Sequence, residues 1–205
     1  MPAAPAVALC NFITRNFSMF RYFLGVVLML PLSAPAGDTD PALMSEARTL
    51  AGEFVAALKP QLKGALQTQG PAGAIAVCAD IAPQLADSLS LSSGWNVRRV
   101  SLKNRNASRA IPDAWEREQL TQFDAQAGEA TDAELIEHGE QVGNRFRYLR
   151  AQRVEGVCLT CHGQQLSPEV IEALDIYYPD DIATGYSMGD VRGAISLSRS
   201  VESPR

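Results

Sequence analysis

Apolar residues in the first half of the chain recur with helical spacing. Beyond Asp40-Pro41 they repeat at steps of three and four residues as far as Leu62, which predicts an amphipathic helix with Asp40 as its N-cap. Pro60 is expected to kink or split this helix, and Gly70-Pro71 to end it. Residues 72–88 predict a second helical stretch, which begins with small and apolar residues that a bulky group could approach closely.

The second half of the chain combines strand and helix patterns. Period-two alternation predicts three strands, over residues 95–102, 145–154 and 191–198. Helical signals predict three helices, over residues 113–127, after a cap at Thr131, and from Ser167 to near Tyr178. The apolar phase of the first strand changes at Arg98 and Arg99, so a bulge is expected there. Helices first and strands later favour an α+β fold with an antiparallel sheet.

Residues 1–36 have the composition of a signal peptide. An apolar run, Tyr22–Leu32, follows Arg15 and Arg21 and precedes Ala34-Pro35-Ala36, a small-x-small cleavage site. The run is too short for a comfortable membrane span, so membrane contact is expected only if this leader stays uncleaved. The leader predicts an exported, periplasmic protein.

Residues 37–205 are predicted to form one domain, and either Met1 or Met19 could start the leader. Loss of the two leader arginines from 18 basic residues leaves 16 against 23 acidic residues, a net charge of −7. Such a balance offers no general basic surface for nucleic acid, and it favours solubility.

The run Cys158-Leu159-Thr160-Cys161-His162 is a Cys-x-x-Cys-His motif, the attachment site of a c-type haem. On one helical turn both thiols can reach the vinyl groups at one haem edge, and His162 can place its imidazole on the iron. One covalently attached haem c is therefore expected. The alternatives are a redox-active thiol pair, a small disulfide, or half of a zinc site that could recruit only Cys78 and His138.

The ligand on the other side of the iron has few candidates. Cys78 lies in the small-residue helix, and it is the odd thiol once Cys10 leaves with the leader. Met188 and Met44 are possible thioether ligands, and His138 is expected on an exposed polar helix. Composition alone does not separate Cys78 from Met188, and a buried cysteine can also be a small core residue.

Several stretches together resemble a family of small exported c-type haem proteins with a PAS-like domain, long known as a domain of unknown function. They occur in the family's order and span nearly all of residues 37–205: Ala74-Ile-Ala-Val-Cys78 with Ala82-Pro83, Arg98-Arg-Val-Ser-Leu-Lys103 with Arg105-Asn106, Pro112-Asp-Ala-Trp-Glu116, Cys158-Leu-Thr-Cys-His-Gly163, Tyr178-Pro-Asp-Asp181, Gly185-Tyr186, Gly189-Asp190 and Arg192-Gly-Ala194.

This resemblance implies a PAS-like antiparallel sheet flanked by helices, with a long N-terminal helix. It also implies iron ligation by His162 on one side and by the thiolate of Cys78 on the other. One segment departs from the family, which tends to have Asn-Pro-x-Asn where this chain has Asn106-Ala-Ser-Arg109. Relatives fused to signalling kinases imply redox or ligand sensing, and this chain would act alone or through a partner.

The densest basic cluster of the sequence is Arg98, Arg99, Lys103 and Arg105. A guanidinium matches a carboxylate in two parallel hydrogen bonds, so Arg98 and Arg99 are candidate partners of the haem propionates. The alternative is a solvated loop with ordinary surface ion pairs.

The sequence favours a redox or small-molecule sensor with an unknown signalling or redox partner, and a diatomic gas is a possible ligand. A periplasmic electron-transfer cytochrome is the alternative, and a stable ligand such as Met188 would favour it. An enzyme is not expected, because no nucleophile–base set, phosphate loop or carboxylate cluster is visible.

Overall fold

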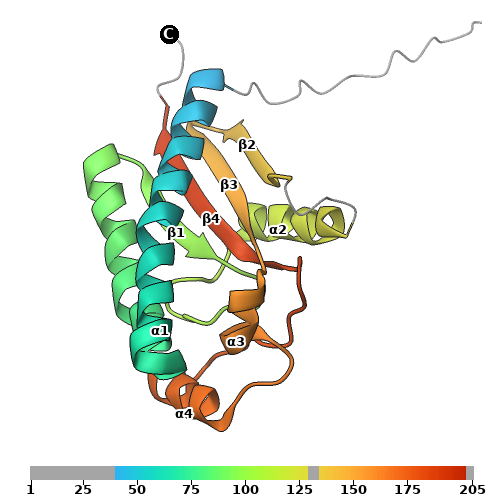
Figure 1. Ribbon diagram of the computed structural model, residues 1–205. Coiled ribbons are helices and arrows are strands. Elements are labelled where there is room, and N and C mark those ends of the chain that lie inside the picture. The colour runs from blue at the N-terminus through green and yellow to red at the C-terminus, as the bar shows by residue number, and fades with distance from the viewer. Residues whose placement is uncertain (1–39, 129–133, 202–205) are drawn as a thin grey trace, which may run out of the picture. The chain divides into compact units, whose positions relative to one another are not determined.

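The computed structural model describes residues 40–128 and 134–201 (Figure 1). The predicted leader, its cleavage site and the cap at Thr131 lie outside these residues. The described elements are α1 (Pro41–Ser93), β1 (Asn96–Val100), α2 (Ala114–Ala127), β2 (Glu137–Val142), β3 (Arg145–Arg153), the 3-10 turn η1 (Gly156–Cys158), α3 (Leu159–His162), α4 (Pro168–Tyr177) and β4 (Val191–Ser200). The expected α+β class with a long N-terminal helix is confirmed.

Helix α1 begins at Asp40-Pro41 and breaks at Gly70, both as predicted. The side chain of Asp40 accepts hydrogen bonds from the amides of Ala42 and Leu43, which satisfies two free donors of the first turn. Pro60 does not split the helix. The one residue inside α1 with non-helical dihedrals is Gly70 (φ 72°, ψ −172°), a conformation open to glycine because it lacks a Cβ. There the helix turns, and its second half runs back beside the first (Figure 1).

Four strands form one antiparallel sheet in the order β1-β4-β3-β2. The two halves of α1 cover one face, where Phe54, Ala82 and Trp95 share a core with Phe146 and Tyr148 of β3. Helix α2 covers the other face through Leu120 and Phe123, which pack against Val100 and Leu149. We call these the α1 face and the α2 face.

Strand β1 is regular, so the bulge expected at Arg98 and Arg99 is wrong. Its five residues pair with β4 without a shift in register. Val97 lies in the core of the α1 face and Val100 in that of the α2 face. The apolar phase changes along this strand because both faces are covered, and no slip in pairing is needed.

The irregularity of the sheet lies in the partner strand. Gln152 pairs with Gly193 and Arg153 with Val191, so Arg192 is an extra residue of β4. Gly193 is required beside it, because a Cβ there would lie 2.4 Å from the carbonyl oxygen of Val100, and φ is +155°. Bulges of this kind redirect a side chain and are frequent next to functional sites.

The segment that contains His138 is a strand, and the predicted helix after Thr131 is wrong for these residues. β2 pairs with β3 through a two-residue turn at Gly143-Asn144. Glu137, Glu140 and Gln141 favour a helix in isolation, but pairing with β3 outweighs that preference. A glycine–asparagine pair between two runs of strand residues is a hairpin signal that could have revealed this turn.

By length and composition, one helix of the described residues, α1, could cross a membrane. Core helices pass the same test, and α1 supplies Ala47, Ala51, Phe54 and Ala82 to the core of the α1 face. The predicted single membrane contact, through an uncleaved leader, falls on residues outside the described part of the chain.

Candidate functional site

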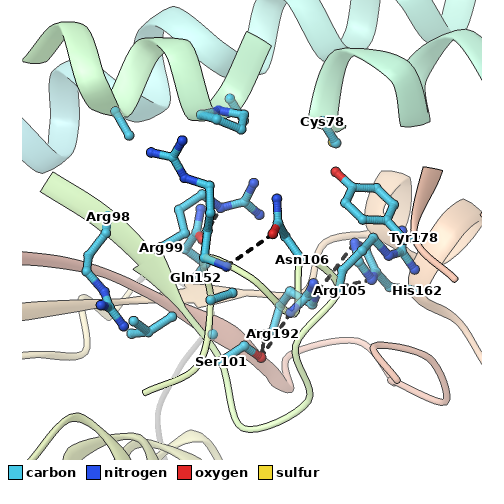
Figure 2. Close-up of a pocket in the computed structure, with 17 residues that line it drawn as sticks. Cys78, Arg98, Arg99, Ser101, Arg105, Asn106, Gln152, His162, Tyr178 and Arg192 are labelled. Carbon is cyan, nitrogen blue, oxygen red and sulfur yellow. Dashed lines mark hydrogen bonds between the residues drawn. The ribbon is translucent and has the colours of Figure 1, made fainter. Parts of the chain in front are cut away.

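A pocket of about 710 Å³, partly open to solvent, lies on the α1 face at the end of the sheet near α3 (Figure 2). Its lining comes from the second half of α1, β1, the loop that follows β1, Gln152 of β3, the bulge of β4, α3 and the residue after α4. The side chains that argue for function are Cys78, Arg99, Arg105, His162, Tyr178 and Arg192.

The Cys-x-x-Cys-His motif is helical, as expected from its spacing. Cys158 ends the 3-10 turn η1, while Cys161 and His162 lie in α3, which continues directly from it. The end of α3 is fastened to residues 185–186, because the amide of Gly185 donates to the carbonyl of Gly163 (2.9 Å) and that of Tyr186 to the carbonyl of His162 (3.0 Å). These two backbone hydrogen bonds thus hold His162 next to the loop that precedes β4.

His162 is held as a neutral imidazole with a defined tautomer. Its Nδ1 lies 2.7 Å from the carbonyl oxygen of Ala183, to which it donates. The side chain of Arg192 places Nε 3.0 Å from Nδ1 and 3.3 Å from Nε2, so only Nε2 is left to accept. Burial, then the charges of Arg192 and Arg105, lower the pKa of His162 to about 2. A neutral ring whose Nε2 carries a lone pair is the form that binds metals.

Three free thiols are gathered near this pocket. Cys161 packs beside the apolar cluster of α1 and α4 that contains Ile75 and Leu174, and Cys158 beside Val154 and Ala183. Burial raises the pKa of Cys161, and the thiols of Cys78 and Cys158 raise it further. The three thiols therefore lie close enough to affect one another electrostatically, and the described cysteines form no disulfide.

Cys78 reaches the pocket from α1, and His162 reaches it from α3. Figure 2 shows Cys78 pointing down from the helix toward Tyr178, whose hydroxyl is turned toward it. Burial and then the neighbouring Cys78 raise the pKa of Tyr178. A thiol and an imidazole, the two donors expected from the sequence, thus line one pocket.

The other proposed iron ligands lie elsewhere. Met188 is 60% exposed and lines a different hollow with Lys103 and Arg153. Met44 packs in the core of the α1 face beside β2, and a Cβ on Gly139 would lie 2.6 Å from its Sδ. His138 stands on β2 with Nε2 3.2 Å from Oε1 of Glu140, outside the pocket lining. Among the described residues no group of three or more His, Cys, Asp and Glu side chains forms a zinc-like cluster.

The predicted basic cluster divides between the two faces of the sheet. Arg98 extends away from Cys78 and His162 in Figure 2, and its Nη2 donates to the carboxylate of Glu116 (3.2 Å) and to the carbonyl of Ile111 (2.5 Å). Arg99 faces the pocket, where its Nε lies 3.4 Å from Oε1 of Gln152. The two neighbouring arginines therefore have different surroundings.

The other two cations of the cluster hold loops. Lys103 donates to the carbonyl of Thr184 (3.3 Å) and lies 5.0 Å from the ring centre of Tyr186. Arg105 is 6% exposed and pairs with Asp181 at 3.0 Å. Both side chains therefore fasten the segment around residues 181–186 to the loop after β1.

The segment that departs from the family pattern, residues 106–109, forms a local turn at the pocket rim. Oδ1 of Asn106 accepts from the hydroxyl of Ser108 (2.8 Å) and from the amide of Arg109 (3.2 Å). The guanidinium of Arg109 pairs with Asp87 of α1. This turn ties the loop to the helix that carries Cys78.

Arg192 is a pocket residue that the sequence analysis missed. The bulge directs it to His162, and its Nη1 donates to the hydroxyl of Ser101 (3.0 Å) and to the carbonyl of Lys103 (3.2 Å). Burial and the charge of Arg99 lower its pKa to about 10. Among the described residues no carboxylate lies within ion-pair distance of Arg99 or Arg192. Gly193 was a signal, since a glycine inside a strand often marks a bulge.

Two comparisons with known proteins found the same family of proteins. A family model described as Tll0287-like matches residues 34–200. A crystal structure of the cyanobacterial heme-protein Tll0287 is similar to this chain, with a TM-score of 0.61 and 21% identity over 82% of this chain and all of that one. At this identity the likeness shows a common fold. No curated protein matches the sequence.

Proposed function

The chain belongs to the Tll0287-like family, and we propose that it is an exported protein that binds one haem c, attached through Cys158 and Cys161 and ligated by His162 and Cys78. The observation that carries this proposal is that Cys78 and the motif histidine line one pocket. The solved relative described as a heme-protein supports it. We further propose that residues 37–205 are a PAS-like domain and that it works in the periplasm.

The residues present suit a haem. The neutral imidazole of His162 and the thiol of Cys78 would bind the iron, and the motif thiols on their helical turn would hold the haem covalently. Arg99 and Arg192 bring positive charge without carboxylate partners among the described residues, which suits the two haem propionates. Metal binding at Nε2 would require Arg192 to leave the ring of His162, and this would release its guanidinium for a propionate.

The haem would supply a one-electron redox centre with an exchangeable axial position. The chain's own groups set how that centre behaves. The carbonyl of Ala183 fixes the tautomer of His162. A thiolate from Cys78 favours the ferric state and hence a low reduction potential. Tyr178 stands beside that thiol and could donate to the thiolate.

We propose redox or small-molecule sensing as the biological role, with a redox or signalling protein as partner. A thiolate ligand is readily released on reduction or protonation, which opens the site to a diatomic gas or changes the contacts of α1. The exposed position of Met188 favours this role over an electron-transfer cytochrome, which needs a stable second ligand. We propose no catalytic activity, since His138 stands outside the pocket.

Covalent attachment is tested by expressing the chain with a cytochrome c maturation system and measuring its intact mass. The wild type is expected to carry one haem that resists acid–acetone extraction, and Cys158→Ser with Cys161→Ser to lose it. Cys78→Ser is the matched control and should keep the covalent haem, because it changes the ligand and not the attachment. A wild type without covalent haem would overturn the proposal.

Sensing is tested with carbon monoxide on the ferrous protein. Release of the Cys78 ligand predicts binding of carbon monoxide and a shift of the Soret band. A ferrous protein that keeps both ligands and binds no carbon monoxide would replace sensing by electron transfer.

A further inference from the structure

We infer that Arg105 and Asp181 form a buried clamp that sets the ring orientation and tautomer of His162, an inference that rests on the proposed haem ligation. Both side chains are 7% exposed. Oδ2 of Asp181 accepts from Nε (3.1 Å) and lies 3.0 Å from Nη2 of Arg105. The sequence analysis placed Arg105 only in the basic cluster, and this pairing commits its charge to Asp181.

The arginine of the clamp holds the haem-attachment segment directly. Its Nη2 donates to the carbonyl oxygen of Cys161 (2.5 Å) and to that of Ala183 (3.3 Å). Carbonyls at the end of a helix lack partners within the helix, so Arg105 satisfies one of them inside the motif itself. One guanidinium thus joins the turn that carries a haem thiol to the carbonyl that orients the ligand histidine.

The aspartate of the clamp holds the same carbonyl from the other side. Oδ1 of Asp181 accepts from the amide of Ala183 (2.8 Å), and the carbonyl of Ala183 accepts from Nδ1 of His162 (2.7 Å). The peptide segment at Ala183 is therefore gripped at both its amide and its carbonyl. Ala183 is fully buried, so water cannot replace these partners easily.

The physical role of such a pair is positional more than stabilising. Taking two charges out of water costs nearly as much as their attraction returns, so a buried ion pair is weak evidence for stability. Its fixed geometry, in contrast, defines where each hydrogen-bonding partner must lie. Groups that hydrogen-bond to a ligand histidine fix its tautomer and raise its basicity toward the metal. Arg105 and Asp181 are thus positioning residues, two contacts removed from the ligating Nε2.

The clamp is tested by the exchange of the Nδ1 proton of His162 with water, measured by ¹⁵N NMR of the full-length, dithionite-reduced protein. The chain has two histidines, so His138 is an internal reference in each spectrum. Arg105→Lys and Asp181→Asn are expected to speed exchange at Nδ1 about tenfold, the loss expected when a charged hydrogen bond is removed. The His138 signal should not change. In the haem-loaded protein the same variants should broaden the ferric low-spin EPR signal.

The matched control is the exposed pair Arg199–Glu46, which has the same chemistry outside the pocket lining, with 42% and 43% of the side chains exposed. Arg199→Gln with Glu46→Gln should leave both histidines unchanged. If a single clamp variant does not fold, Arg105→Met with Asp181→Leu removes both charges, and it should fold while still releasing His162.

Two results would overturn the clamp: exchange at His162 unchanged in the clamp variants, or an equal change at His138, which would mark general destabilisation. Failure of the haem proposal looks different. A protein that carries no haem, but whose His162 Nδ1 proton is released by the clamp variants, would keep the clamp and contradict the haem.

Discussion

The two faces of the sheet differ in the partners that they offer to arginine side chains. On the α2 face, Arg98 pairs with Glu116, which is buried and also accepts from the hydroxyl of Ser196 (2.6 Å) and the amide of Asp113 (2.9 Å). On the α1 face, Arg99 has one long contact to a glutamine. The side chains of two adjacent residues thus enter a hydrogen-bonded network on one face and a pocket on the other. In that pocket Arg99 and Arg192 lack carboxylate partners among the described residues.

This difference indicates that the α2 face has a structural role and that the pocket on the α1 face has a functional one. Each carboxylate oxygen of Glu116 has a hydrogen-bond partner, so the network fixes the position of α2. The pocket instead is lined by an uncharged imidazole, a thiol and guanidinium groups. Two guanidinium groups without carboxylate partners among the described residues are costly for a fold alone, and this agrees with the haem proposed above.

The largest loss of stability is expected from removing Glu116, the buried acceptor of the network on the α2 face. Glu116→Ala leaves Arg98 and Ser196 without their buried acceptor and should lower the free energy of unfolding by about 3 to 5 kcal/mol. Urea denaturation followed by tryptophan fluorescence measures this. Glu118→Ala, an exposed residue of the same helix, is the control and should change little. A small loss at Glu116 would mean that the network is not structural.

An acid titration of the stability of the haem-free protein tests whether the imidazole of His162 is held uncharged. The pKa of His162 in the folded protein is about 2, below the ordinary 6.5 expected when unfolded, because burial and Arg192 oppose its charge. The unfolded chain therefore takes up the proton first as pH falls below 6.5. Above pH 6.5, the contribution of His162 to the free energy of unfolding should be constant. Below pH 6.5, it should fall by roughly 1.4 kcal/mol per pH unit.

The comparison for this titration is His162→Gln, which should lose that part of the slope while the carboxylates still contribute theirs. His138→Gln should keep the wild-type slope. Equal slopes in the wild type and His162→Gln would show that this imidazole is not held neutral by the fold.

The smallest and most selective effects on stability and reduction potential are expected from substitutions of the neighbouring residues Arg98 and Arg99. Arg98→Leu should cost about 1 to 2 kcal/mol of unfolding free energy, because one charged hydrogen bond to Glu116 is lost, and should leave the haem potential unchanged. Arg99→Leu should cost less than about 0.5 kcal/mol, as surface-like changes do, and should lower the potential, because a positive charge near the haem is removed. Redox titration beside urea denaturation separates the two. Equal potentials would remove Arg99 from the haem site.

Much of the site could be predicted because it is local. The spacing of Cys158, Cys161 and His162 encodes a helical turn by itself, and the structure forms one there. Asp40 and Pro41 encode the start of α1 in the same way. That Cys78 and His162 line one pocket agrees with the ligand set implied by the family resemblance.

What could not be predicted depends on pairing between distant strands. The bulge was expected in β1 from a change of apolar phase, yet it lies in β4, where only the register against β3 reveals that Arg192 is an extra residue. The pairing of Arg105 with Asp181 spans 76 residues. Contacts of this kind are fixed by the packed fold, so they leave no periodic signal in the sequence.

The account depends most on Cys78, and the most direct test is a low-temperature EPR spectrum of the ferric protein, with wild type, Cys78→Ser and Met188→Leu side by side. The wild type and Met188→Leu should give the same narrow low-spin signal of a thiolate-ligated haem, and Cys78→Ser should lose it. A spectrum of the histidine–methionine or bis-histidine type that persists in Cys78→Ser would contradict the account and make Cys78 a core residue.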